Sequence, residues 1–375
     1  MKKFICALLA ALLCLPFYAV TGSAGEAPEQ PAAEAAPADQ AAPVPVSYDK
    51  LEELVTAGNP AVAAVNQAYD KIKVQIDELE RQDQDLSSRR PGAAYVAILI
   101  NIRTNVKNLK KALGDEDKDT RTAIGSQLFA ARMLYLKNYA LAAQLESLNH
   151  GIANANEDLT SYKSRYELGV LPYSAVDTFE KNIKTMNDGT KALQRSIESN
   201  LSGLAALLGI AGKIELAGFP EIDTASIAAR DYNADLAAYT LSAPDVQTKR
   251  NAVESAQKAY NDTPSDTNKF ALDTAESDYA KAQATAAVNF PDVYKNLTDE
   301  YSDYVTSTTV SDAQSDLDKA ERRYALGLIP KTALTSARRA LDAAELKYGQ
   351  DSITLCIDLL QYEFNLINWD DAGSI

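Results

Sequence analysis

The chain has 375 residues, a formal net charge of −15 and one histidine. This length is enough for one large or two ordinary domains, and the acidic balance argues against sequence-independent binding to nucleic acid phosphates. The sequence has no nucleophile elbow, phosphate-binding loop or Cys/His metal spacing. It therefore predicts a protein that is not an enzyme and that has no cofactor and no metal.

The first 24 residues have the pattern of a secretory signal peptide. Two lysines precede a short apolar run that contains Pro16, and the run ends in small residues. Lipid attachment at Cys14 is the alternative, although no small residue stands before it. Cleavage of residues 1–24 would leave Cys356 as the only thiol, which excludes an intramolecular disulfide. No later apolar run reaches the ~18 residues of a membrane helix.

Residues 25–46 are rich in Ala and Pro and are predicted to be a flexible linker, so that the folded part begins near Ser47. From there apolar residues recur at spacings of three and four, which predicts an all-α protein. Residues 118–168 contain no proline and are expected to form one helix about 75 Å long. A helix of that length indicates an elongated, coiled-coil-like body.

An internal repeat is the strongest feature of the sequence. The segment RYELGVLPYSAV at 165–176 matches RYALGLIPKTAL at 323–334. In each copy a glycine suits the left-handed end of a helix, a proline three residues later prevents continuation, and a hydroxyl residue is expected to cap the next helix. These residues are Gly169, Pro172 and Ser174, with Asp177 on the first turn, and Gly327, Pro330 and Thr332 in the second copy.

The repeat sets the expected domain organisation: a first helical hairpin repeat at 47–215, a connector at 216–230, a second repeat at 231–370 and a tail at 371–375. Pro60 and Pro244 are each expected in the first turn of a helix. The first copy is longer than the second, and the additional residues are predicted around 90–114.

With these features the chain resembles the TolC family of outer-membrane efflux proteins over residues 47–370. That family has two tandem repeats, each opening near Asn-Pro, turning at Arg-Tyr-x-x-Gly and ending near Leu-Leu-Gly. Asn59-Pro60 and Leu207-Leu208-Gly209 fit this pattern in the first repeat. The resemblance implies an exported homotrimer in the outer membrane, periplasm or cell envelope. It would conduct substrates passively as the channel or duct of a tripartite efflux or type I secretion system.

The resemblance also implies partners, namely a periplasmic adaptor protein and an inner-membrane pump. The adaptor would dock on the two hairpin tips, at Arg165, Tyr166, Gly169, Pro172, Ser174, Asp177, Arg323, Tyr324, Gly327, Pro330, Thr332 and Thr335. Family members often have acidic residues near this tip that constrict the pore. Here Arg338 and Arg339 follow instead, so no gating residues are assigned.

A second departure concerns the strands that close into a membrane β-barrel in the family. Residues 93–112 alternate poorly and are expected to be a helix, while 260–269 is expected to be a loop. The predicted fold is therefore a TolC-type α-barrel protomer with the barrel strands reduced or absent, and contact with a membrane is left open. A non-transporting helical envelope or spacer protein of the same family is the alternative function.

Two polar features have simple structural explanations. Residues 115–119 are rich in carboxylates but lack the spacing of a calcium loop, and acidic residues at the start of a helix explain them. His150 is expected to be a surface or packed residue and not a metal ligand. The many tyrosines, which combine an apolar ring with a polar end, are expected to pack along the helices.

Overall fold

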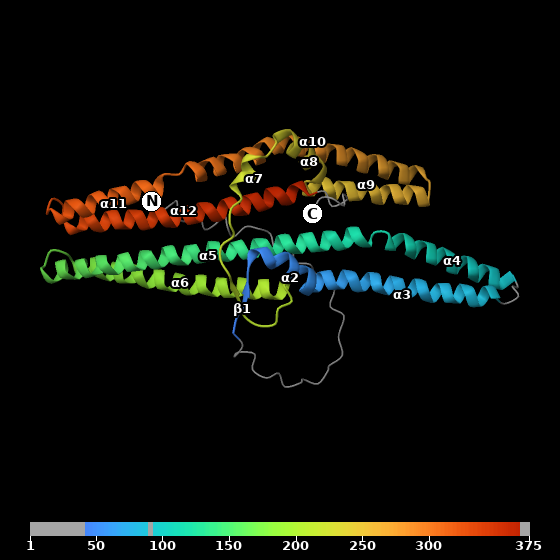
Figure 1. Ribbon diagram of the computed structural model, residues 1–375, viewed down its shortest axis with the longest axis horizontal. Coiled ribbons are helices and arrows are strands. Elements are labelled where there is room, and N and C mark those ends of the chain that lie inside the picture. Colours follow the sequence, from blue (N-terminus) through green and yellow to red (C-terminus); the bar gives the residue numbers. More distant parts are fainter. Residues whose placement is uncertain (1–41, 89–92, 368–375) are drawn as a thin grey trace, which may run out of the picture. The chain divides into compact units, whose positions relative to one another are not determined.

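The computed structural model describes residues 42–88 and 93–367, and nearly all of this part of the chain is helical, which confirms the all-α prediction (Figure 1). The predicted signal peptide, the alternative lipid attachment at Cys14 and the predicted tail at 371–375 lie outside the described residues. The helices are α2 (Leu51–Gly58), α3 (Pro60–Ser88), α4 (Ala93–Leu113), α5 (Glu116–Glu167), α6 (Tyr173–Leu207), α7 (Thr224–Ala228), α8 (Tyr232–Ser242), α9 (Pro244–Asp262), α10 (Asp266–Thr306), α11 (Thr309–Ala325) and α12 (Lys331–Leu366), with one 3₁₀ turn, η2 (Tyr48–Lys50).

The described part of the predicted linker contains a strand, which corrects the expectation of a flexible segment up to residue 46. Val44–Val46 form β1, which pairs in parallel with β2, Ile214–Leu216. The side chain of Val46 is 1% exposed and joins a core that includes Leu51 and Val55. The prediction rested on the Ala- and Pro-rich composition and did not consider Val44 and Val46, which stand on either side of Pro45. Valine, and the residue before a proline, both favour extended backbone.

The long helix expected at 118–168 is confirmed as α5, which has 52 residues and a length of about 78 Å. It reverses into α6, and the two helices run antiparallel side by side (Figure 1). They approach closely at two glycines: a Cβ atom on Gly151 would lie 2.9 Å from Cε of Met186, and one on Gly189 would lie 3.2 Å from Cδ2 of Leu148. Small residues at these positions allow the close packing.

The helical prediction for 93–112 is confirmed by α4, which packs against α3. The predicted loop at 260–269 is shorter in the structure, because α9 extends to Asp262 and α10 begins at Asp266. The additional length of the first repeat is not confined to 90–114, since α3 has 29 residues and α9 has 19. A helical hairpin grows by extending both arms, so the extra residues are shared between them.

The two sequence motifs at the ends of the first repeat meet in space. Asn59 caps α3, with Oδ1 accepting hydrogen bonds from the backbone N–H of Ala61 at 2.8 Å and of Val62 at 3.0 Å. Its Nδ2 donates to the carbonyl oxygen of Leu207 at 2.7 Å. Gly209 has a φ of +66°, and a Cβ atom there would lie 2.0 Å from the carbonyl oxygen of Gly58. This junction joins the start of α3 to the end of α6.

The predicted division into repeats and connector remains a prediction. The helices α2 to α6 fall within 47–215, α7 within the connector and α8 to α12 within 231–370, whereas β2 crosses the boundary at residue 216. Within the described ranges, no helix combines the length and apolar character needed to cross a membrane.

Candidate functional site

The first repeated turn closes the α5–α6 hairpin. After α5 ends, Gly169 adopts a φ of +70°, which confirms the predicted left-handed conformation. The N–H of Val170 donates to the carbonyl oxygen of Arg165 at 2.8 Å, and the N–H of Gly169 donates to that of Tyr166 at 2.8 Å. This pair of hydrogen bonds is a Schellman motif, which satisfies carbonyl groups that the helix end leaves free.

The second repeated turn closes the α11–α12 hairpin in the same way. Gly327 has a φ of +68°. The N–H of Leu328 donates to the carbonyl oxygen of Arg323 at 2.9 Å, and the N–H of Gly327 donates to that of Tyr324 at 2.8 Å. The sequence repeat is therefore also a repeat of backbone conformation.

The predicted capping role of Ser174 and Thr332 is wrong. The N-cap of α6 is Pro172, with φ −73° and ψ 151°, and that of α12 is Pro330, with φ −73° and ψ 159°; neither cap has a side-chain hydrogen bond. The hydroxyl residues are the second residue of each helix, two positions after the N-cap, so they do not have the non-helical backbone that lets a capping side chain reach the free N–H groups. The predicted place of Asp177 on the first turn is also wrong, since the first turn of α6 contains no acidic residue; Asp177 accepts a hydrogen bond from Nζ of Lys181 at 2.6 Å.

The structure places the predicted site residues at the two turns, six at each, and all are exposed except for the half-buried Asp177 and Thr335. They form two separate groups along the chain: Arg165, Tyr166, Gly169, Pro172, Ser174 and Asp177, and Arg323, Tyr324, Gly327, Pro330, Thr332 and Thr335. Just beyond each turn a buried side chain, Val176 or Leu334, attaches the returning helix to its neighbours.

The apolar side chains at the turns were not assigned to the docking surface from the sequence. In the first turn Leu168 is 78% and Val170 61% exposed, and in the second Leu326 is 74% and Leu328 66% exposed. Both pairs occupy matching positions of the repeat, which is the signal that could have identified them. Each turn therefore presents apolar surface on a backbone held by its own hydrogen bonds.

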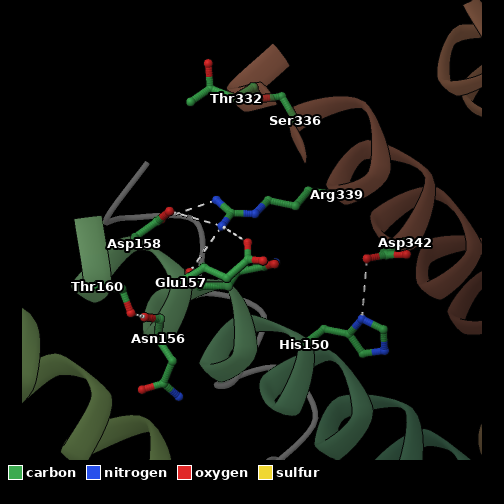
Figure 2. A network of polar contacts seen from close by, with 10 residues as sticks. His150, Asn156, Glu157, Asp158, Thr160, Thr332, Ser336, Arg339 and Asp342 are labelled. Atoms are coloured by element: carbon green, nitrogen blue, oxygen red, sulfur yellow. Dashed lines mark hydrogen bonds and ion pairs between the residues drawn. The ribbon is translucent and has the colours of Figure 1, made fainter. Parts of the chain in front are cut away.

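Further from the turns, Arg339 connects the two hairpins (Figure 2). Its guanidinium extends from α12 to α5, where it donates to Oδ1 of Asp158 at 3.0 Å and to Oε2 of Glu157 at 3.1 Å. It also donates to the carbonyl oxygen of Asn154 at 3.2 Å. The hydrogen bond to Asp158 is the main cause that raises the pKa of Arg339. Sequence analysis noted Arg339 only as a departure from the family.

His150 and Glu116 of the acidic segment 115–119 each lie next to a charged side chain of another helix. Nδ1 of half-buried His150 lies 3.7 Å from Oδ2 of Asp342 on α12 (Figure 2). Glu116 accepts a hydrogen bond from Lys73 at 2.7 Å. In the part of the chain that the structure describes, no group of three or more His, Cys, Asp or Glu side chains could hold a metal ion.

Comparison with known proteins gives matches among solved structures. No family model and no curated protein matches the chain. The chain resembles outer-membrane channels. A membrane protein from Pseudomonas aeruginosa is 12% identical over 93% of this chain and 99% of its own, with a TM-score of 0.47. CusC is 12% identical over 85% of this chain and 91% of its own, with a TM-score of 0.45. The CmeC outer-membrane channel of Campylobacter jejuni is 11% identical over 85% of both chains, with a TM-score of 0.44.

Proposed function

We propose that this protein is the channel or duct component of a tripartite efflux or type I secretion system, and that its hairpin turns dock an adaptor protein. The observation that supports the docking role is the pair of matching turns with exposed apolar side chains at their ends. The proposal also rests on the resemblance of the repeats to the TolC family. Transport would be passive, so that energy comes from a partner pump.

The physical argument starts from the four apolar side chains at the turns, Leu168, Val170, Leu326 and Leu328. Apolar groups that stand together on an otherwise polar surface commonly mark an interaction site. The Schellman hydrogen bonds hold each turn in one conformation, so docking would order little additional backbone. A rigid apolar end of this kind suits the matching turn of another helical hairpin.

The remaining partners follow from the same proposal. The protein would act as a homotrimer in the cell envelope, at the outer membrane or in the periplasm, together with a periplasmic adaptor and an inner-membrane pump. Each protomer would contribute the α5–α6 and α11–α12 hairpins to a helical duct. The adaptor would meet the duct at the turns around Gly169 and Gly327.

Adaptor binding by the purified full chain tests the docking role. The change Leu168→Glu together with Leu326→Glu should reduce affinity at least tenfold, because each introduces a charge into an apolar contact. Phe270→Glu on α10 is a matched control, since Phe270 is equally exposed but distant in sequence from both turns. Unchanged affinity in the double variant, or an equal loss in the control, would contradict the docking role.

The oligomeric state separates the channel from the spacer alternative. Light scattering coupled to size exclusion should give the mass of three chains for the channel component. A monomer at all accessible concentrations would instead favour a non-transporting helical envelope or spacer protein. The same sample, imaged by electron microscopy, should show a hollow helical tube.

A further inference from the structure

A cavity of about 920 Å³ lies where α5, α10, α12 and the segment after β2 meet. Its volume is in the range of sites that hold small molecules. The turns discussed above do not line it, so it is independent of the proposed docking role. The composition of its walls indicates which class of molecule it suits.

Carboxylates dominate the charged groups around this cavity. Four of them line it: Glu146 from α5, Glu221 from the segment after β2, and Asp342 and Glu345 from α12. His150 is the only basic side chain among the described lining residues, and its ring faces Asp342 (Figure 2). With neutral histidine the walls carry four negative charges, which favours a cation and disfavours an anion.

Aromatic rings form the apolar part of the walls. Tyr304 and Tyr348 stack with ring centroids 5.2 Å apart and an interplanar angle of 19°. Phe219 packs edge to face on Tyr139, with centroids 5.3 Å apart. All four rings line the cavity, and Phe219 and Tyr348 are partly exposed. The electron-rich faces of aromatic rings attract cations, and their flat surfaces accept a flat apolar body.

Further carboxylates extend the negative region on α10 and α12. Glu300, one turn before Tyr304, has its pKa raised to about 8, first by burial and then by hydrogen bonding to Asp358. The carboxylates of Asp303 and Asp351 raise it further. A carboxyl with a pKa of about 8 is neutral at pH 7, so Glu300 adds no negative charge there, and the negative charge near Tyr304 and Tyr348 comes from the carboxylates of Asp303 and Asp351.

We propose that this cavity binds an organic cation with a flat aromatic or apolar body. The cationic group would lie among the carboxylates of Glu146, Glu345 and Asp342, and the apolar body would pack against the aromatic rings. Such a site goes beyond the channel and docking roles, neither of which requires it.

Two dyes with the same type of ring system test the proposal on the purified full chain. Rhodamine 6G carries a positive charge and fluorescein a negative charge, so fluorescence anisotropy separates charge selectivity from stacking. We expect saturable binding of rhodamine 6G that weakens with added salt, and at least tenfold weaker binding of fluorescein. Equal binding of the two dyes, or no saturable binding of rhodamine 6G, would overturn the proposal.

Substitutions locate the binding. Glu146→Gln with Glu345→Gln should weaken rhodamine 6G binding about tenfold, because two exposed carboxylates next to the cation are lost. Tyr348→Ala should weaken it several-fold through loss of a ring face. The matched control is Glu198→Gln on α6, an exposed carboxylate outside the cavity. Equal weakening of dye binding in the control would show that the dye binds elsewhere. Unchanged dye binding in both cavity variants, with their thermal melting also unchanged, would show the same.

Discussion

The two hairpin turns have the same backbone, but the side chains that flank them bind differently. The repeat aligns Asp158 with Asp316 and Lys181 with Arg339. Asp316 pairs with Lys319 at 2.8 Å and Lys181 with Asp177 at 2.6 Å, each within its own helix. Asp158 and Arg339 instead pair with each other across the two hairpins.

This difference separates two kinds of position in a tandem repeat. The glycines and prolines that reverse the chain act through neighbouring residues, so they do the same in both copies. The charged positions face different surroundings, because each copy contacts the other with a different helix. Asp316 and Lys181 therefore each pair with a residue of their own helix, whereas Asp158 and Arg339, at the matching positions of the other copy, pair with each other between the repeats.

The largest expected effect compares two left-handed glycines. Gly209→Ala should lower the free energy of unfolding by about 3 kcal/mol or more, because positive φ is unfavourable for alanine and the Cβ would overlap the carbonyl of Gly58. Gly169→Ala should cost about 1 kcal/mol, since no atom lies within 4 Å of its Cβ position. Chemical denaturation measures both, and equal losses would show that the Gly58 contact relaxes.

An intermediate effect is expected at the aligned basic residues. Arg339→Ala should destabilise the fold by about 1–2 kcal/mol, because it removes charged hydrogen bonds between α12 and α5. Lys181→Ala removes a solvent-exposed pair within α6 and should leave the free energy of unfolding nearly unchanged. A double-mutant cycle of Arg339→Ala with Asp158→Ala should show coupling, whereas one of Arg339→Ala with Asp316→Ala should show none.

The last comparison concerns a pH dependence that arises from Glu300 in the second repeat. Folding raises the pKa of Glu300 from 4.5 to about 8, so the folded state binds an additional proton between these values. The free energy of unfolding should therefore decrease as pH rises from 4.5 to 8.

Asn200 occupies the position of α6 that matches Asp358 of α12, and it donates a hydrogen bond to the carbonyl oxygen of Leu134 at 3.1 Å. The change Asp358→Asn introduces the residue type found at the matching position of the first repeat. It should flatten the pH dependence, because it removes the carboxyl group that lies next to Glu300. Denaturation curves recorded across this pH range measure the slope. An unchanged slope in the variant would assign the dependence to other groups.

Several elements were predictable because their causes are local in sequence. Gly169 and Gly327 are left-handed as expected, since a Schellman motif involves only six consecutive residues. The single helix α5 followed from the spacing of apolar residues and the absence of proline, and the helical state of 93–112 from its poor strand-like alternation. The expected caps Ser174 and Thr332 failed by two positions, because each helix begins directly after the proline, which has extended backbone and is itself the N-cap.

The sequence by itself therefore determined the helical class, the repeat and the chemistry of both turns, all of which depend on residues close together in the chain. Only the tertiary structure decided the rest. β1 needs β2, which lies about 170 residues later, and Arg339 meets Asp158 only after two hairpins have packed. The carboxylates and rings of the cavity come from four separate segments. The sequence pattern within any one segment does not predict that the four segments come together.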